Sequence, residues 1–417
     1  MKGFKGEFMD NLLHTKISTK LSIYPNIGRW LFLLFWCEYT IIYWISLFLG
    51  KIPLIGFIGE SLFTILVAGA LVICGKSFFK RIKLFDIFFF IAVLLVWNIQ
   101  YIIHPSFQYF HEQEAMRCLS AFGLYFVGRF VAEEGIDSRL FNDLYKYSIA
   151  GLLLMIIYMF IGRYVDSSGA GGNMTLAYWI LPSVLCVITK ALSQPSLIRY
   201  TLSFIGLILL MFMGTRGAFL TAIVYASSYF IFFGLDNRKK QLICVISLIA
   251  ITVLVSFVDF KYIMSSIFGP LASLLGVSDR IIGGFISGDV TSDNGRFVIY
   301  NELINRIYID PSGYGLFSDR YYAVGNLYAH NFILEILMDF GIVIGLLFIF
   351  LYFYYSIKEM LNKKLPIETR YMICMLFTYC TVKLSVSSSW IFESYFYLLI
   401  GILLGTNYYK SSVNPKH

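Results

Sequence analysis

Long runs of apolar residues alternate with short polar segments along most of this chain. A helix needs about 20 predominantly apolar residues to cross the hydrocarbon core of a bilayer. By that criterion the pattern predicts an all-α polytopic membrane protein with about 12 transmembrane helices. The expected spans are Trp30–Leu49, Leu54–Cys74, Leu84–Ile103, Ala115–Ala132, Tyr147–Ile161, Met174–Thr189, Tyr200–Gly214, Gly217–Leu235, Gln241–Val258, Asn331–Tyr355, Tyr371–Val386 and Trp390–Leu404.

The composition excludes an ordinary soluble protein. Of the 417 residues, 58% are hydrophobic and only 14% are charged, whereas a soluble domain carries about a quarter charged residues. The excess apolar surface requires lipid as its solvent. The seven cysteines fall in apolar stretches without metal or disulfide spacing, so we expect them to be small buried hydrophobic residues.

The basic residues are distributed unevenly, and this indicates the orientation of the chain. With the N-terminus in the cytoplasm, two thirds of the 33 lysines and arginines fall in cytoplasmic segments, and the short outer loops carry one or none. This asymmetry follows the positive-inside rule, so both termini are expected to be cytoplasmic. It also accounts for the net charge of +8 without nucleic acid as a partner.

One large outer loop, residues 259–330, breaks the pattern of short connections. Loops of this length are uncommon and often functional. The expected organisation is a cytoplasmic N-terminal segment (1–29), transmembrane helices one to nine (30–258), the outer loop (259–330), helices ten to twelve (331–405) and a cytoplasmic tail (406–417).

The outer loop contains an expected amphipathic helix, Gly295–Ile309. Four apolar residues are expected to form one stripe because they recur at helical spacing. They are Phe297, Tyr300, Ile304 and Ile307. The turn-forming residues Asp310-Pro311-Ser312-Gly313 then end the helix.

Three ionisable residues at the outer rim are candidates for chemistry. Arg216 lies in the expected tight turn between spans seven and eight, Arg296 begins the amphipathic helix, and His330 precedes span ten. Two arginines offer forked N–H donors and permanent charge, which suit a diphosphate. A histidine can take a proton from a hydroxyl near neutral pH. The set predicts a transferase site for a diphosphate leaving group, although an interfacial arginine also snorkels or pairs with a lipid headgroup and a histidine can simply cap a helix.

Several short motifs follow one another from Asn294 to Ile349. They are Gly295-Arg296, Asn301-Glu302-Leu303-Ile304, Pro311-Ser312-Gly313-Tyr314-Gly315, Ala329-His330-Asn331-Phe332-Ile333-Leu334-Glu335 and Gly341-Ile342-Val343-Ile344-Gly345. This stretch resembles the carboxy-terminal signature of the O-antigen polymerase and O-antigen ligase superfamily of bacterial glycan-assembly proteins. Thr215-Arg216-Gly217-Ala218 is similar to the family's Ser-Arg-Gly-Ala motif, with Thr in place of Ser.

The resemblance implies a metal-independent glycosyltransferase, without a cofactor, on the outer face of the bacterial plasma (inner) membrane. Its donor would be an oligosaccharide on undecaprenyl diphosphate, held by Arg216 and Arg296, while His330 would activate the acceptor hydroxyl. The leading interpretation is a repeat-unit polymerase for O-antigen, capsule or exopolysaccharide. One alternative is a ligase-type transfer to lipid A core or another acceptor. Membrane lipids, a chain-length regulator and a flippase are candidate partners.

A second alternative is that the chain is itself a polysaccharide flippase or transporter. That function predicts intramembrane charges along a pathway and pseudo-symmetric halves. No internal repeat is visible in the sequence, so the pattern favours the enzyme.

Other polar residues have less specific patterns. Arg117, near the outer end of span four, is either a third phosphate contact or a buried partner of a carboxylate such as Glu38. Tyr314 is a candidate for stacking on a sugar ring. Lys383 and Glu393 are expected to pair across spans eleven and twelve.

Two further groups invite a ligand interpretation that their spacing does not support. The first is a set of residues in one expected outer loop, namely His104, His111, Glu112 and Glu114. Their spacing matches no ligand pattern, so we expect a polar loop and no metal site. The glycine-rich run 166–172 lacks the Lys and the following Ser or Thr of a phosphate-binding loop, so we expect a flexible connection.

Overall fold

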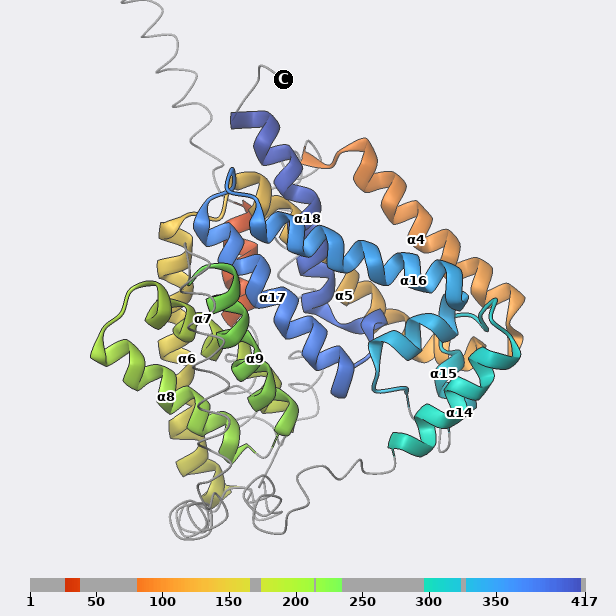
Figure 1. Cartoon of the computed structure of the whole chain (residues 1–417), viewed down its shortest axis with the longest axis horizontal. Coiled ribbons are helices and arrows are strands. Elements are labelled where there is room, and N and C mark those ends of the chain that lie inside the picture. The colour runs from red at the N-terminus through yellow and green to blue at the C-terminus, as the bar shows by residue number, and fades with distance from the viewer. Residues whose placement is uncertain are drawn as a thin grey trace, which may run out of the picture.

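The computed structural model describes residues 27–37, 81–165, 174–213, 215–234, 296–323 and 328–413. Within these ranges every regular element is a helix (Figure 1), as predicted. The N-terminal helix is Ile27–Cys37. The others are α4 (Leu84–Ile103), η2 (Pro105–Phe107), α5 (Gln108–Glu134), α6 (Ser138–Val165), α7 (Met174–Ser193), α8 (Leu197–Phe212), α9 (Arg216–Phe232), α14 (Arg296–Ile309), α15 (Ser318–Tyr322), α16 (Phe332–Leu361), α17 (Ile367–Val386), η5 (Trp390–Phe392) and α18 (Ser394–Val413).

Five stretches of the described chain are long and apolar enough to cross a membrane. They are Leu84–Ile103, Pro105–Glu134, Ser138–Ile157, Leu176–Ser193 and Phe332–Leu361. The expected spans 54–74 and 241–258, most of the span 30–49, and the glycine-rich run 166–172 lie outside the described residues. The total of twelve spans and the cytoplasmic position of the termini therefore stay predictions.

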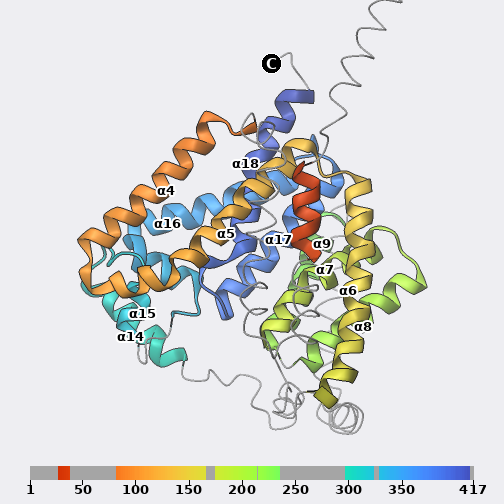
Figure 2. The same ribbon diagram turned by 180° about the vertical axis from the view of Figure 1, so that it is seen from behind.

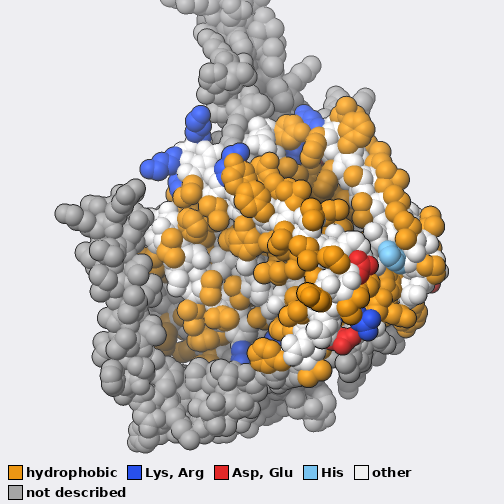
Figure 3. All heavy atoms as spheres, turned by 45° about the vertical axis from the view of Figure 1, so that its right-hand side comes forward, with side chains coloured by type: hydrophobic (Ala, Val, Ile, Leu, Met, Phe, Trp, Pro, Cys, Tyr) orange, Lys and Arg blue, Asp and Glu red, His pale blue; other side chains and the backbone are white. Residues whose placement is uncertain are grey.

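The visible surface matches a protein that is surrounded by lipid. In Figure 3, apolar side chains cover the middle of the molecule, and lysines and arginines gather at its upper end. Large exposed apolar residues include Phe88 and Leu95 of α4 and Val343 and Phe350 of α16. Because water would disfavour so much exposed apolar surface, this face suits the interior of a bilayer.

Among the described helices, the closest packing joins α5 and α18, which lie side by side in the middle of the molecule (Figures 1 and 2). A Cβ atom on Gly128 of α5 would lie 2.2 Å from the carbonyl oxygen of Leu398. A Cβ atom on Gly401 of α18 would lie 2.1 Å from the carbonyl oxygen of Tyr125. Gly405, four residues further on, makes a similar approach. Small residues at this spacing let two membrane helices bring their backbones together.

A buried ion pair fixes one end of this packing. The guanidinium of Arg129 in α5 is fully buried, with Nε 3.5 Å from Oδ1 of Asp86 in α4. The Tyr125 hydroxyl donates to the same carboxylate oxygen at 2.6 Å, and the ring of Tyr408 in α18 lies 3.8 Å from the guanidinium carbon. Since a buried charge is stable only with partners, this network ties α4, α5 and α18 together.

The predicted tenth span is interrupted. Gly341 in α16 has φ 75° and ψ 176°, so the helix breaks between Phe340 and Ile342. The loop before α15 fills the break: the Tyr314 amide donates to the Met338 carbonyl at 2.7 Å, and the Ile342 amide donates to the Pro311 carbonyl at 2.9 Å. The motifs at 311–315 and 341–345 are therefore parts of one contact.

The predicted amphipathic helix exists as α14, but of the four residues in the predicted stripe only Ile307 is buried. The side of α14 that packs against the protein consists of Ile299, Leu303 and Ile307. Phe297 is 64% exposed and Ile304 is 49% exposed. Apolar residues surround this helix on several sides, so the spacing alone did not identify the buried one.

The cysteines within the described residues follow the prediction. Cys118, Cys186, Cys374 and Cys380 are buried, Cys37 is partly buried, and all five are unbridged. They act as small apolar side chains in the helix packing.

Candidate active site

Three helices meet around the side chain of Tyr178 in α7. A Cβ atom on Gly217 would lie 2.2 Å from the Tyr178 hydroxyl and 2.7 Å from Cγ2 of Val386. Glycine therefore allows the start of α9 to pack against α7 and the end of α17. Lys383 of α17 places its ammonium 5.2 Å from the centre of the Tyr178 ring. Arg216, the half-buried first residue of α9, lies directly beside this contact.

Arg296 and His330 approach this region from the outer loop. Arg296 is the first residue of α14, and its positive charge acts on His330, Tyr328 and Tyr178. In Figure 1 the start of α9, the end of α17 and the start of α14 lie on the same, lower side of the molecule. The structure thus places Arg296 within electrostatic reach of His330 and of Tyr178, whose hydroxyl lies against the beginning of α9.

The imidazole of His330 is neutral at physiological pH. Burial disfavours its charged form, and the nearby charge of Arg296 adds to the effect, so the pKa of His330 falls to about 4. Its Nδ1 atom is buried and has no hydrogen-bond partner among the described residues. A neutral imidazole can accept a proton from a hydroxyl group.

The backbone holds His330 in an uncommon conformation. Its φ of 50° lies in the left-handed region, which costs a residue other than glycine about 1–3 kcal/mol unless its surroundings impose it. Three contacts do so. The Tyr300 hydroxyl donates to the His330 carbonyl at 3.4 Å, the Tyr328 ring lies 3.8 Å from the imidazole, and the Ala329 amide donates to Oδ2 of Asp319 at 2.7 Å.

Asp319 belongs to a buried charged cluster next to this segment. Its members are Asp319, Arg320, Glu335 and Asp339. Arg320 forms an ion pair with Glu114 of α5 at 2.9 Å, which joins α15 to α5. Burial raises the pKa of Asp319, although the Ala329 amide and the charge of Arg320 oppose the rise. The cluster therefore holds the backbone before His330 by hydrogen bonds and charge.

The segment between α17 and α18 binds the same cluster. Glu335 accepts hydrogen bonds from the Ser389 hydroxyl and, at 3.2 Å, from the Trp390 amide. The indole N–H of Trp390 donates to Oδ2 of Asp339 at 3.0 Å. These bonds fix η5 against the first part of α16, which follows His330 directly.

Lys383 and Glu393 form the pair that the sequence predicted. Their charged atoms are 2.7 Å apart. The Ser388 hydroxyl donates to the same carboxylate at 2.9 Å, and the Lys383 ammonium donates to the Tyr379 hydroxyl at 3.0 Å. The prediction is confirmed, and the pair borders the site because Lys383 also lies over Tyr178.

Two other residues were predicted to contact the substrate: Arg117 is exposed, whereas Tyr314 packs between helices. The Arg117 side chain is 71% exposed and pairs with Glu114 at 3.4 Å, so the interpretation of Arg117 as a buried ion-pair partner is wrong. The Tyr314 hydroxyl donates to the Arg306 carbonyl at 2.9 Å, and its ring packs against Tyr322 with centroids 5.0 Å apart. Tyr314 thereby joins the end of α14 to α15.

The predicted polar loop around His111 is also wrong. The expected loop residues from His111 onwards lie in α5, which begins at Gln108. His111 is 1% exposed, and its ring centroid lies 4.7 Å from that of Trp97 and 4.9 Å from that of Phe317. Aromatic rings enclose this imidazole because α4 and the loop before α15 pack over the start of α5.

Tyr178, Tyr328 and Asp319 were not singled out from the sequence. The two tyrosines are members of a chain with 30 tyrosines, so nothing local distinguishes them. The pair Asp319-Arg320 carried a signal, since it begins four residues after Gly315, the end of a motif. Adjacent opposite charges in a mostly apolar outer loop indicate a tertiary role.

Comparison with known proteins identifies one relationship. Residues 201–350 match a family model described as O-Antigen ligase. The matched range includes Arg216, Arg296 and His330, together with most of α8, all of α9, α14 and α15, and the first part of α16. No curated protein and no solved structure matches the chain.

Proposed function

Because the match over residues 201–350 supports membership of the O-antigen polymerase and ligase superfamily, we propose that this chain is a membrane-embedded glycosyltransferase. It joins polysaccharide repeat units by moving a growing glycan from undecaprenyl diphosphate to an acceptor sugar on another lipid-linked unit. The family implies a polymerase or ligase type of activity. The polymerase, the lipid diphosphate donor and the outer face of the bacterial inner membrane are our proposal.

The observation that carries the proposal is a neutral histidine beside an arginine. His330 with a pKa of about 4 can accept a proton, and Arg296, whose charge contributes to that low pKa, can bind an anion. A bound diphosphate would offset the charge of Arg296 and raise the pKa of His330 toward neutrality. The site therefore gains basicity when the donor is in place.

The reaction needs one bond to form and one to break. His330 takes the proton from the acceptor hydroxyl, and that oxygen forms a bond to the anomeric carbon of the donor glycan. The bond from the anomeric carbon to the diphosphate oxygen breaks, and the electron pair leaves with the diphosphate. Arg296 and Arg216 stabilise the charge that develops there. Direct displacement of this kind inverts the configuration at the anomeric carbon.

Variants of the three residues test the proposal. We expect His330→Ala, Arg296→Gln and Arg216→Gln to abolish long lipid-linked chains on a gel while the protein stays in the membrane. Arg306→Gln is the matched control, because Arg306 lies on the same helix as Arg296 but pairs with Glu302 at 3.0 Å. A normal ladder of long chains from well-expressed His330→Ala protein would refute the catalytic role.

Arg117 needs its own test as a third phosphate contact. Its exposed side chain pairs with Glu114, which also holds Arg320. A phosphate contact predicts a loss of long chains in Arg117→Gln. An unchanged ladder would remove Arg117 from the site.

Ligation is the second candidate function, because the matching family model is described as an O-antigen ligase. The same three residues would then transfer a finished glycan to lipid A core or another acceptor. A deletion strain separates the two functions. Loss of a ligase leaves long chains on the lipid carrier, whereas loss of a polymerase leaves single repeat units there.

A further inference from the structure

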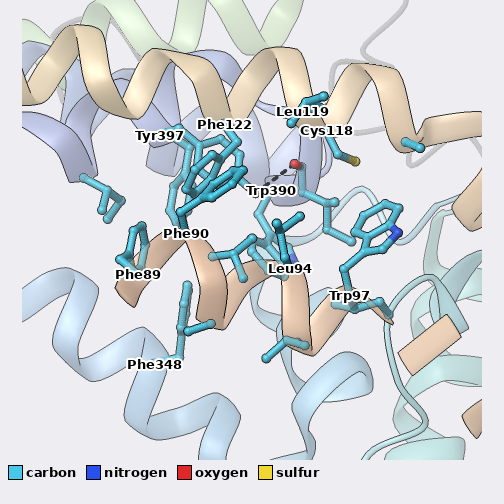
Figure 4. A pocket seen from close by; sticks show the side chains of 18 of the residues that line it. Phe89, Phe90, Leu94, Trp97, Cys118, Leu119, Phe122, Phe348, Trp390 and Tyr397 are labelled. Atoms are coloured by element: carbon cyan, nitrogen blue, oxygen red, sulfur yellow. Dashed lines mark hydrogen bonds between the residues drawn. The ribbon is translucent and has the colours of Figure 1, made fainter. Parts of the chain in front are cut away.

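A large apolar cavity lies between α4, α5, α16 and α18 (Figure 4). Its volume is about 530 Å³. Nine of its 19 lining residues are aromatic, among them Phe89 and Phe90 of α4, Phe122 of α5 and Phe348 of α16. The lining contains no side chain that carries a charge, so the cavity suits a hydrocarbon and excludes a sugar or a phosphate.

The cavity lies under α4, which has one buried residue, Asp86, and whose half-buried Phe89 and Phe90 rings pack against Phe122 with centroids 5.8 and 5.6 Å apart. At one end Asp86 binds Arg129 and Tyr125. At the other end Trp97 packs against His111 and Phe317. Between these contacts α4 has no buried residue, and Figure 2 shows it standing at the edge of the molecule.

The outer side of α4 faces the surroundings with large apolar residues. Phe88 is 61% exposed and Leu95 is 55% exposed. If α4 lies in lipid, the cavity is separated from the bilayer by this one helix. A lipid chain can reach it from the side without crossing water or a polar surface.

One residue connects the cavity with the candidate active site. Trp390 lines the cavity, while its amide and indole N–H groups bind Glu335 and Asp339. Three residues further on, Glu393 pairs with Lys383 at the edge of the site. The apolar cavity and the polar site are thus two sides of the short segment between α17 and α18.

We propose that this cavity holds part of the isoprenoid chain of the lipid diphosphate donor. This inference rests on the proposed function, which requires an apolar tail to be bound close to a diphosphate. The cavity provides such an apolar site. It lies on one side of the segment between α17 and α18, and Lys383 lies on the other side. Flat aromatic walls suit the flat double bonds and methyl branches of isoprene units.

Photolabelling in nanodiscs tests the occupant directly. The probe is undecaprenyl diphosphate with a photoreactive group near the middle of its chain and no glycan. We expect the label on peptides of α4, α5 and α18, and we expect unlabelled undecaprenyl diphosphate to compete while a diacyl phospholipid does not. Equal competition by the phospholipid would overturn the proposal, because the cavity would then bind any membrane lipid.

Two neighbouring positions on α4 provide a matched pair of variants. Leu94 lines the cavity, whereas Leu95 does not. Leu94→Trp fills the space and should reduce the labelling at least about fivefold, in keeping with the cost of overpacking a filled site. Leu95→Trp should leave the labelling unchanged. Leu119→Trp fills the cavity from the α5 wall and replaces Leu94→Trp if that variant misfolds. Equal labelling of both filling variants and Leu95→Trp would refute the proposal.

The outcomes separate this inference from the proposed function. His330→Ala should lose glycan transfer and keep the label in the cavity. A wild-type protein that transfers glycan but is labelled elsewhere refutes the cavity proposal alone. A labelled cavity in a protein whose His330→Ala variant still makes long chains refutes the catalytic proposal alone.

Discussion

Alanine in place of Gly128 and alanine in place of Gly123, both in α5, should have opposite effects on the stability of the protein. A Cβ atom on Gly128 would lie 2.2 Å from the carbonyl oxygen of Leu398 and 3.1 Å from the amide nitrogen of Ile402. The neighbouring atoms are backbone, so they cannot turn aside, and α5 and α18 must move apart. A Cβ atom on Gly123 would have nothing within 4 Å. The two positions differ in their packing and share the same helix.

The magnitudes follow from those distances. Overpacking of this kind costs roughly 1–3 kcal/mol, which outweighs the higher helix propensity of alanine, so Gly128→Ala should destabilise the protein. Gly123→Ala adds no clash, and alanine in a helix is more stable than glycine by up to about 1 kcal/mol. Alanine gains the same helix propensity at both positions, so the free energies of unfolding of the two variants should differ by the overpacking cost alone, about 1–3 kcal/mol.

Thermal unfolding in detergent, followed by size-exclusion chromatography, measures the difference. We expect Gly128→Ala to lose its monodisperse peak at a lower temperature than the wild type, and Gly123→Ala at the same or a higher temperature. Glycan ladders from the two variants show whether the packing also matters for transfer. Equal melting temperatures for the two variants would refute the inferred close packing of α5 and α18.

Three other predictions concern the site and its support. Gly341→Ala should lower both stability and glycan transfer. The φ of 75° disfavours any side chain at this position, and a Cβ atom would lie only 2.4 Å from the Ser312 carbonyl. An unchanged ladder and melting temperature would contradict the observed break in α16. Lys383→Met should cost about 3–5 kcal/mol by leaving a buried carboxylate unpaired, and adding Glu393→Gln should recover most of the loss in thermal unfolding; no recovery would argue against the pair. His330 has a pKa lowered from 6.5 to about 4, so the unfolded chain binds more protons between these values and the histidine contributes stability above pH 6.5 that is lost as the pH falls toward 4. The acid limb of kcat/KM in a pH profile of the wild type should accordingly lie below pH 6.5. In Arg296→Gln the pKa of His330, followed by NMR, should rise, and an unchanged pKa would show that Arg296 does not act on His330.

The local chemistry of the sequence determined the class of this protein and the identity of its conspicuous polar residues. Apolar runs of helical length predict membrane helices because an apolar helix satisfies its backbone groups without water. Arg216, Arg296, His330 and the pair Lys383–Glu393 stand out for a related reason. A charged side chain within or beside an apolar membrane segment is costly, so it usually has an ion-pair partner or a function.

Only the tertiary structure decided which faces of the helices are buried. In lipid, both the protein-facing side and the lipid-facing side of a helix are apolar, so periodicity does not distinguish them. The enclosure of His111 and the break at Gly341 each depend on a neighbour that is distant in sequence. The cavity beside α4 likewise depends on how four helices pack against one another. Such contacts are set by the shape of the partner surface, which the pattern along one helix does not contain.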